Sequence, residues 1–287
     1  MNPRPTVLSI AGLDPSGCAG LLADIKVFES HAVQGIGALT ANTHQNIHQF
    51  KAANWVQIEA IIQQLDLLFQ DFQPTVIKIG IVENLNVLHQ IVSFIRSHSF
   101  NNALSKRPII IWDPILRATA PFQFHSHLDT ALLINCLSAI DLVTPNAEEL
   151  PILLQSLPTA NPTANPTANT TANPTANPTA NTSTNPTANP TNTAAITQYC
   201  NLLLKGGHQQ GERAQDILYT SSGVSSISSP RLQGFDKRGT GCVLSAAIAA
   251  NMAKGKTMFE SCCSAKQYMN TFLTSSTNRI GTHHAAY

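Results

Sequence analysis

The chain has little charge, and the charge it has is balanced. Its 17 Lys and Arg residues face 16 Asp and Glu residues over 287 positions, a formal net charge of +1. A nucleic-acid-binding protein needs a basic surface, so this balance argues against that class. No apolar run approaches the roughly 20 residues of a membrane span, and the first residues hold no apolar stretch typical of a secretory signal. We therefore expect neither a nucleic-acid partner nor a membrane partner.

Cysteine is scarce, and its spacing lacks the patterns of metal or disulfide sites. The six residues lie at positions 18, 136, 200, 242, 262 and 263, with no CxxC pair. Neither a zinc site nor a disulfide framework follows from such spacing. We interpret all six as reduced thiols and expect a cytoplasmic protein.

One segment lacks both charged and large apolar side chains. Residues 158–193 repeat Pro-Thr-Ala-Asn with small variations and leave 251 residues for the rest of the chain. The period is too short for a solenoid layer, and the recurring proline removes helix hydrogen bonds. With nothing to bury, the segment cannot offset its ordering entropy. We predict a disordered or polyproline-like surface loop that interrupts one domain spanning 1–287. An adhesive or interaction role for the repeat is the alternative.

Outside the repeat, short apolar runs alternate with helical patterns. Strands are expected at 6–11, 36–40, 75–79, 108–112, 141–144 and 202–205, with a hairpin of 216–220 and 224–228. Helices are expected at 19–31, 55–72, 84–98, from 147, at 241–254 and at 257–275. This alternation predicts an α/β fold with a mostly parallel sheet covered on both faces. Sites in such sheets lie beyond the carboxyl ends of the strands. That rule places on one rim Gly12, Asp113, Asn146 and Gly206.

A glycine turn before a helix of small residues is the sharpest motif. It reads Gly239-Thr240-Gly241-Cys242. The glycines allow a tight turn, and the free N–H groups of the following helix favour an anion such as a phosphate in transfer. A thiol at a helix start has a lowered pKa, so Cys242 is placed to take a proton from an attacking hydroxyl. The alternative is a plain glycine turn with Cys242 as a small core residue.

Three further segments carry polar candidates. Glycines in 12–20 let a ligand approach the backbone, and Asp24 could then direct its carboxylate at a ligand amine or hydroxyl, or only face the helix dipole. Asp113, Asn146 and Glu149 supply oxygen ligands of the kind Mg²⁺ prefers, while Asn146 and Glu149 also fit a helix cap. Lys205, at a strand end before two glycines, is a candidate phosphate contact or a solvated lysine.

Six segments, taken in order, resemble one known family. They are VLSIAGLDPSGCAGLLADIK, KIG (78–80), WDPIL, TPNAEE, LLKGGH and GTGCVLSAA. The chain resembles hydroxymethylpyrimidine/phosphomethylpyrimidine kinases of the ribokinase-like superfamily over nearly its whole length except 158–193. The resemblance implies a three-layer α/β/α fold, a homodimer, and use of ATP and Mg²⁺. It also implies phosphorylation of a hydroxymethylpyrimidine and then of its monophosphate in thiamine biosynthesis.

The resemblance also implies a role for each matching residue. Cys242 would be catalytic, within the anion turn of Gly239, Thr240 and Gly241. The pyrimidine would be bound by Gly12, Ala19, Asp24, Thr43, Gln45, Ile81 and Ile115. Asn146 and Lys205 would bind ATP, and Asp113 and Glu149 would hold the metal. Cys18 stands where the family usually has glycine, and a cysteine at a positive φ would cost on the order of 1 kcal/mol.

Two other functions fit parts of the pattern. A pyridoxal kinase of the same superfamily would share the fold, the ATP site and the mechanism, and its substrate is also a flat heteroaromatic with a hydroxymethyl group. A non-catalytic pyrimidine-binding module would keep the pocket alone. The intact set of Cys242, Asp113, Asn146 and Lys205 argues against the second alternative.

Overall fold

The computed structural model describes residues 3–98, 107–116, 128–158, 190–207 and 211–286. The strands of one nine-stranded sheet are β1 (Thr6–Leu13), β2 (Gln34–Gln45), β3 (Phe50–Trp55), β4 (Val76–Ile79), β5 (Ile109–Trp112), β6 (Leu142–Val143), β7 (Asn201–Leu204), β8 (Arg213–Thr220) and β9 (Gly223–Pro230). Their order across the sheet is β3-β2-β1-β4-β5-β6-β7-β8-β9. The pairs from β2 through β7 are parallel, and the pairs at both edges are antiparallel.

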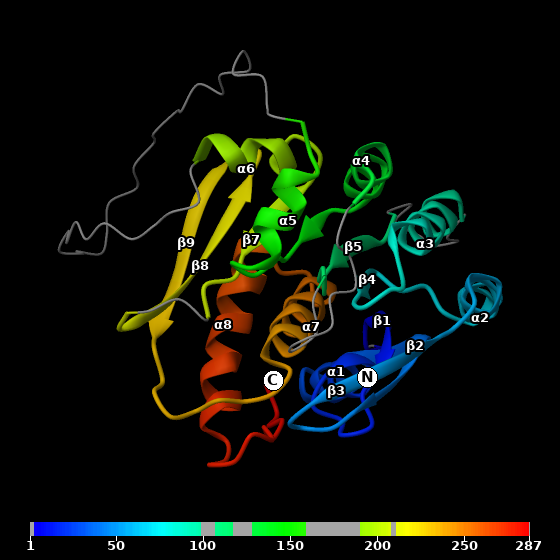
Figure 1. Ribbon diagram of the computed structural model, residues 1–287. Helices are drawn as coiled ribbons and strands as arrows, with labels where there is room; N and C mark the ends of the chain where they lie inside the picture. Colours follow the sequence, from blue (N-terminus) through cyan, green and yellow to red (C-terminus); the bar gives the residue numbers. More distant parts are fainter. Residues whose placement is uncertain (1–2, 99–106, 117–127, 159–189, 208–210, 287) are drawn as a thin grey trace.

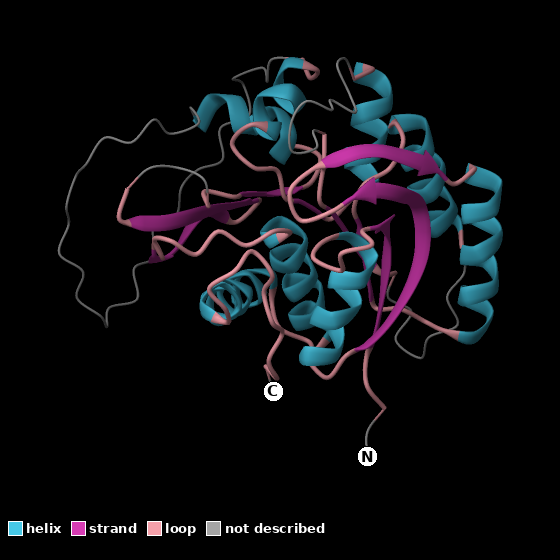
Figure 2. Cartoon of the chain, turned by 60° about the horizontal axis from the view of Figure 1, so that its bottom comes forward, coloured by secondary structure: helices cyan, strands magenta, loops and turns pink. Residues whose placement is uncertain are grey.

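Helices cover both faces of this sheet (Figures 1 and 2). They are α1 (Gly20–Ser30), α2 (Ile58–Asp71), α3 (Leu85–Ser97), α4 (Thr130–Ala139), α5 (Glu149–Gln155), α6 (Pro190–Thr197), α7 (Thr240–Ala253) and α8 (Met258–Thr274). The helices α1, α7 and α8 pack together on one face, and α2 to α6 lie on the other. The three-layer α/β/α architecture with a mostly parallel sheet is therefore confirmed.

The central strands are mostly apolar because both of their faces are buried. All four residues of β4 are buried, and β1 buries every residue between its two ends. Side chains alternate between the faces, so Ile77 and Ile79 join one core while Val76 joins the other. Within the described ranges, no helix is long and apolar enough to cross a bilayer.

Several elements differ from the predicted pattern. Trp55 belongs to β3, where it pairs with Ala41, and α2 begins only at Ile58. The predicted helix over 55–72 therefore started too early, because the apolar Trp55 fits the helical spacing by coincidence. The strand β3 and the helix α4 were not predicted, and β2 is longer at both ends than the expected 36–40. The hairpin of β8 and β9 is confirmed.

The repeat ends in ordered structure. Residues 159–189 lie outside the described residues, but α6 starts at Pro190, inside the predicted loop 158–193. Proline is compatible with the first position of a helix, where its missing N–H has no partner to lose. Thr193 is buried, and Ile196 belongs to the core beneath α6. The prediction of a loop over the full range was therefore wrong at its last four residues.

Shortening the repeat tests where the folded part of this insertion begins. A six-residue Gly/Ser linker in place of 159–189 keeps both α5 and α6, which contact each other. We therefore expect kcat/KM to stay within a few-fold of its value in the full chain. Stability should rise by about 1 kcal/mol, since a shorter loop costs less closure entropy. Extending the deletion through residue 193 is expected to lower stability, because it removes the first turn of α6. Equal melting temperatures for the two deletions would contradict this boundary.

Candidate active site

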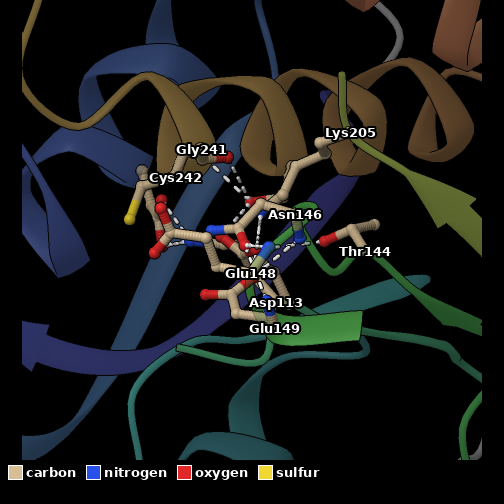
Figure 3. Close-up of polar contacts among 11 residues, drawn as sticks. Asp113, Thr144, Asn146, Glu148, Glu149, Lys205, Gly241 and Cys242 are labelled. Carbon is tan, nitrogen blue, oxygen red and sulfur yellow. Dashed lines mark hydrogen bonds and ion pairs between the residues drawn. The ribbon is translucent and has the colours of Figure 1, made fainter. Parts of the chain in front are cut away.

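The carboxyl ends of the parallel strands meet at one rim, as the sequence predicts. Asp113 follows β5, and a parallel bridge joins Asn146 to Lys205 after β6 and β7. The first turn of α7 lies over them: a Cβ placed on Gly241 would lie 3.4 Å from Lys205 Nζ and 3.9 Å from Asp113 Oδ2. Figure 3 shows Gly241 and Cys242 on this turn beside the polar cluster. The backbone of position 241 therefore lies within van der Waals reach of the Lys205 and Asp113 side chains.

Gly239 forms the turn that opens α7. Its φ of 76° is left-handed, and a Cβ there would overlap the carbonyl oxygen of Cys18. Only glycine meets both requirements without strain. A helix leaves its first N–H groups without intrahelical acceptors, and within the described residues no side chain caps α7. The turn at Gly239 therefore leaves the first N–H groups of α7 without a side-chain cap from the described residues, which is the feature that an anion site would need.

Lys205 and Asp113 form a buried ion pair at the centre of the rim. Lys205 Nζ lies 2.6 Å from Asp113 Oδ1 and 4.0 Å from Glu149 Oε2. Thr144 and Ser245 donate to the two carboxylate oxygens of Asp113 at 3.1 Å each. Burial would raise the pKa of Asp113, but the ammonium group of Lys205 outweighs it and lowers that pKa. Asp113 is therefore a carboxylate, and Lys205 is held at the site rather than solvated.

Asn146 and Glu149 cap the start of α5 reciprocally. The Asn146 side chain accepts from the N–H groups of Glu148 and Glu149 at 2.8 and 2.9 Å, and Glu149 accepts from the Asn146 N–H at 2.8 Å. The capping role is confirmed, and it leaves the Glu149 carboxyl facing Lys205. Burial raises the pKa of Glu149 to about 7 despite the nearby ammonium. This carboxyl therefore gains or loses a proton near neutral pH.

Burial reverses the expected acidity of Cys242. The thiol is 6% exposed, and desolvation raises its pKa, although the charge of Lys78 and a hydrogen bond from the Gly20 N–H act in the opposite direction. The prediction of a lowered pKa was wrong. The helix start stabilises the thiolate by less than the thiolate loses when it is removed from water. Cys242 rests as a thiol.

Asp24 is not aimed at an open pocket. Both of its oxygens lie 2.7 Å from Lys78 Nζ, Ser9 donates to one of them at 2.6 Å, and neither charged side chain is exposed. Burial would lower the pKa of Lys78, but the adjacent carboxylate raises it above its ordinary value. The carboxylate that was predicted to face a ligand is therefore occupied by Lys78 and Ser9 in this structure. The pair instead supplies fixed charge beneath Cys242.

The glycine-rich loop after β1 is organised by Asp14. Its side chain accepts from the Ser16 N–H and hydroxyl and from the Ala19 N–H, at 2.8 to 3.1 Å. Gly17 and Gly20 have positive φ, whereas positive φ among the described non-glycine residues occurs only at Ala32. Cys18 therefore stands in the usual glycine position without backbone strain, and the predicted cost does not arise.

The expected pyrimidine wall is only partly assembled. A Cβ on Gly12 would lie 2.8 Å from a methyl group of Ile81 and 3.6 Å from the methyl group of Thr43, so these three positions are adjacent. Thr43 also donates to the Leu13 carbonyl at 2.6 Å. Ile115 is half-buried after β5. Gln45, at the end of β2, is held by a guanidinium group from the segment before α7.

Comparison with known proteins identifies the family of this chain. The family model described as phosphomethylpyrimidine kinase matches residues 14–286. The chain belongs to the phosphomethylpyrimidine kinase family. This kinase is 28% identical to the hydroxymethylpyrimidine/phosphomethylpyrimidine kinase of Aquifex aeolicus over 274 residues, covering 94% of each chain. It is 30% identical to the Rhizobium meliloti enzyme of the same name over 268 residues, covering 93% of this chain and 90% of that protein.

Solved structures share the fold. The phosphomethylpyrimidine kinase from Clostridium difficile aligns with a TM-score of 0.67 at 23% identity, covering 93% of this chain and 98% of that chain. The pyridoxal kinase from Staphylococcus aureus in complex with AMP-PCP and pyridoxal aligns with a TM-score of 0.75 at 20% identity, covering 99% and 95%. The implied ribokinase-like fold and the prediction of a phosphotransferase are confirmed.

Sequence reasoning missed several residues that shape the site of the kinase. Lys78 lies inside a buried strand, where an apolar residue is expected. A lysine within this apolar run could have indicated a buried ion pair. Ser245 lies one helical turn after Gly241, and Thr144 directly follows β6, so both could have been placed on the rim from spacing. Arg238 gave no signal, because its partner Gln45 is 193 residues away. His208 of the LLKGGH segment lies outside the described residues.

Proposed function

We propose that this kinase uses ATP to phosphorylate 4-amino-5-hydroxymethyl-2-methylpyrimidine and then its monophosphate, a step of thiamine biosynthesis. The observation that carries the proposal is the uncapped first turn of α7, which brings Cys242 and the N–H groups of the anion turn next to Lys205 and Asp113. Family membership supports the substrate class. The curated relatives named above carry the same two activities in their names.

The chain's own residues would do three things during transfer. The backbone N–H groups of Thr240 and Gly241 would stabilise charge on the phosphoryl group, and loss of one such donor typically costs about 2.7–4 kcal/mol. Lys205 would contact an ATP phosphate as well as Asp113, and its ammonium group would neutralise part of the phosphate charge. Cys242 would accept the hydroxymethyl proton, which requires the thiol to ionise first. Thr43, Ile81 and Gly12 would form the apolar wall against the ring.

The donor set also fits magnesium. Asp113 and Glu149 offer carboxylate oxygens within 4.0 Å of Lys205 Nζ, and Mg²⁺ is commonly held by one or two carboxylates together with substrate phosphates. Within the described residues, no group of three or more His, Cys, Asp or Glu side chains forms a closed metal site. A bound Mg²⁺ would supply charge neutralisation for the phosphates. Asn146 would contact ATP beside it.

Magnesium activation is expected to depend on pH through Glu149. Because its pKa is about 7, the carboxyl must lose a proton to bind a cation. The Mg²⁺ concentration for half-maximal rate should therefore be about tenfold higher at pH 6 than at pH 8. Glu149→Gln should weaken Mg²⁺ activation and flatten this pH dependence. Glu148→Gln, which changes an exposed neighbour, is the matched control; an equal effect of both variants would contradict the assignment.

A coupled ADP-release assay with Mg-ATP tests the function directly. Turnover of the hydroxymethylpyrimidine and of its monophosphate is the expected result. Turnover of pyridoxal alone would move the substrate to the other branch of the superfamily. If none of the three compounds causes ADP release, the proposal is refuted. The proposal includes a homodimer and a cytoplasmic location. The six free thiols are compatible with that location. Sedimentation equilibrium would measure the oligomeric state.

A further inference from the structure

Gln45 is placed by the strand that carries Thr43. The two residues lie two positions apart on β2, so their side chains share one face. The irregularity in the pairing of β2 with β3 skips a residue of β3, which leaves this alternation of β2 intact. The hydrogen bond from Thr43 to the Leu13 carbonyl ties the end of β2 to the end of β1. Gln45 therefore extends the wall formed by Gly12, Thr43 and Ile81.

Arg238 contacts Gln45 from the segment that precedes α7. It immediately precedes Gly239, and its backbone N–H donates to the Arg279 carbonyl at 3.0 Å. The preceding Lys237 is buried and donates to the carbonyl oxygens of Ser276 and Asn278. This anchored backbone directs the Arg238 guanidinium to Gln45 Oε1, at 2.9 Å.

The chemistry of the pair fixes which way the amide of Gln45 faces. A guanidinium group has only donors, so the atom of Gln45 that meets it has to be the oxygen. The NH₂ end of the carboxamide is then turned away from Arg238. An unrestrained glutamine could rotate and offer either end to a ligand, whereas this one presents its donors.

We propose that Arg238 is a specificity-determining positioning residue, which holds the Gln45 amide so that its NH₂ donates to a ring nitrogen of the substrate. The inference rests on the proposed function and deepens it. A 4-aminopyrimidine carries ring nitrogens that accept and an exocyclic amine that donates. With the amide so held, the accepting ring nitrogen faces Gln45, and the amine is directed to another partner.

A double-mutant cycle tests this coupling. Arg238→Met is expected to raise KM for the hydroxymethylpyrimidine about three- to tenfold, the effect of one neutral hydrogen bond, with KM for ATP unchanged. Gln45→Leu should have at least this effect, and adding Arg238→Met to it should change KM no further. Arg238→Lys keeps a donor and should recover part of the loss. Arg213→Met removes an exposed arginine of β8 and is the matched control for charge and stability.

Two aminopyridine analogues, each with one ring nitrogen replaced by CH, show which ring nitrogen accepts the hydrogen bond from Gln45. The unmodified kinase should bind one of them about three- to tenfold more weakly than the pyrimidine, and Gln45→Leu should abolish that difference. Equal effects of Arg238→Met in both Gln45 backgrounds would overturn the proposal. So would an effect confined to the monophosphate, which would mean direct contact between Arg238 and phosphate.

Direct calorimetric binding without ATP separates this inference from the proposed function. If the chain binds the pyrimidine with the predicted coupling but releases no ADP, the proposed function fails and the role of Arg238 stands. If it phosphorylates the pyrimidine without the coupling, Arg238 has no such role and the function stands. Absence of any pyrimidine binding would refute both.

Discussion

Replacing Cys242 by alanine is expected to lower kcat about 10²–10⁴-fold, the usual contribution of a general base, while leaving ATP affinity intact. The thiol lies on the first turn of α7 beside the residues that would hold the phosphates (Figure 3). Because it is buried and its pKa is raised, the kcat of the unmodified kinase should climb with pH through the neutral range. Single-turnover rates and equilibrium ATP binding measure the two effects separately.

The matched control for this substitution is Cys136→Ala. Cys136 is a buried thiol on α4, on the opposite face of the sheet, and burial raises its pKa to about 12. Its removal should lower stability and leave kcat and its pH profile unchanged. If Cys242→Ala keeps the kcat of the unmodified kinase, or keeps the same rise with pH, Cys242 is not the base. The anion turn would then act without a side-chain proton acceptor.

Replacing Lys78 by methionine is expected to lower the free energy of unfolding by about 3–5 kcal/mol, because it leaves the Asp24 carboxyl buried without its charge partner. Without Lys78, burial should keep the pKa of Asp24 well above its value in the unfolded chain. An acid whose pKa is raised in the folded state stabilises that state less as pH rises above the unfolded pKa. The variant should therefore lose stability between pH 5 and pH 8, which urea denaturation at both values would measure.

Two further variants distinguish the buried pair from a general loss of packing. Lys78→Met combined with Asp24→Leu should recover most of the stability, since an apolar replacement of a buried pair is often neutral. Arg4→Ala breaks an ion pair with Glu29 whose two side chains are more than half exposed, and it should cost under about 1 kcal/mol. A loss for Lys78→Met no larger than that of Arg4→Ala, or no recovery in the double variant, would contradict this account.

Local patterns were enough to predict the layers and the rim. Apolar runs flanked by glycine or polar residues predicted the six parallel strands, and the hairpin of β8 and β9 follows from Ser222-Gly223 between two β-type runs. The strand ends then brought Asp113, Asn146 and Lys205 together as expected. Where the spacing was ambiguous, as at Trp55, backbone pairing with Ala41 decided between strand and helix.

The sequence by itself determined the order of elements and the residue types at the turns, because both depend on spacing and backbone freedom within a few residues. Only the tertiary structure decided the electrostatics. It buried Asp24 against Lys78 from a neighbouring element, raised the pKa of Cys242 through desolvation, and joined Arg238 to Gln45. Burial and pairing between distant segments follow from which strands become neighbours, as β1 and β4 do. Local periodicity contains no information about that choice.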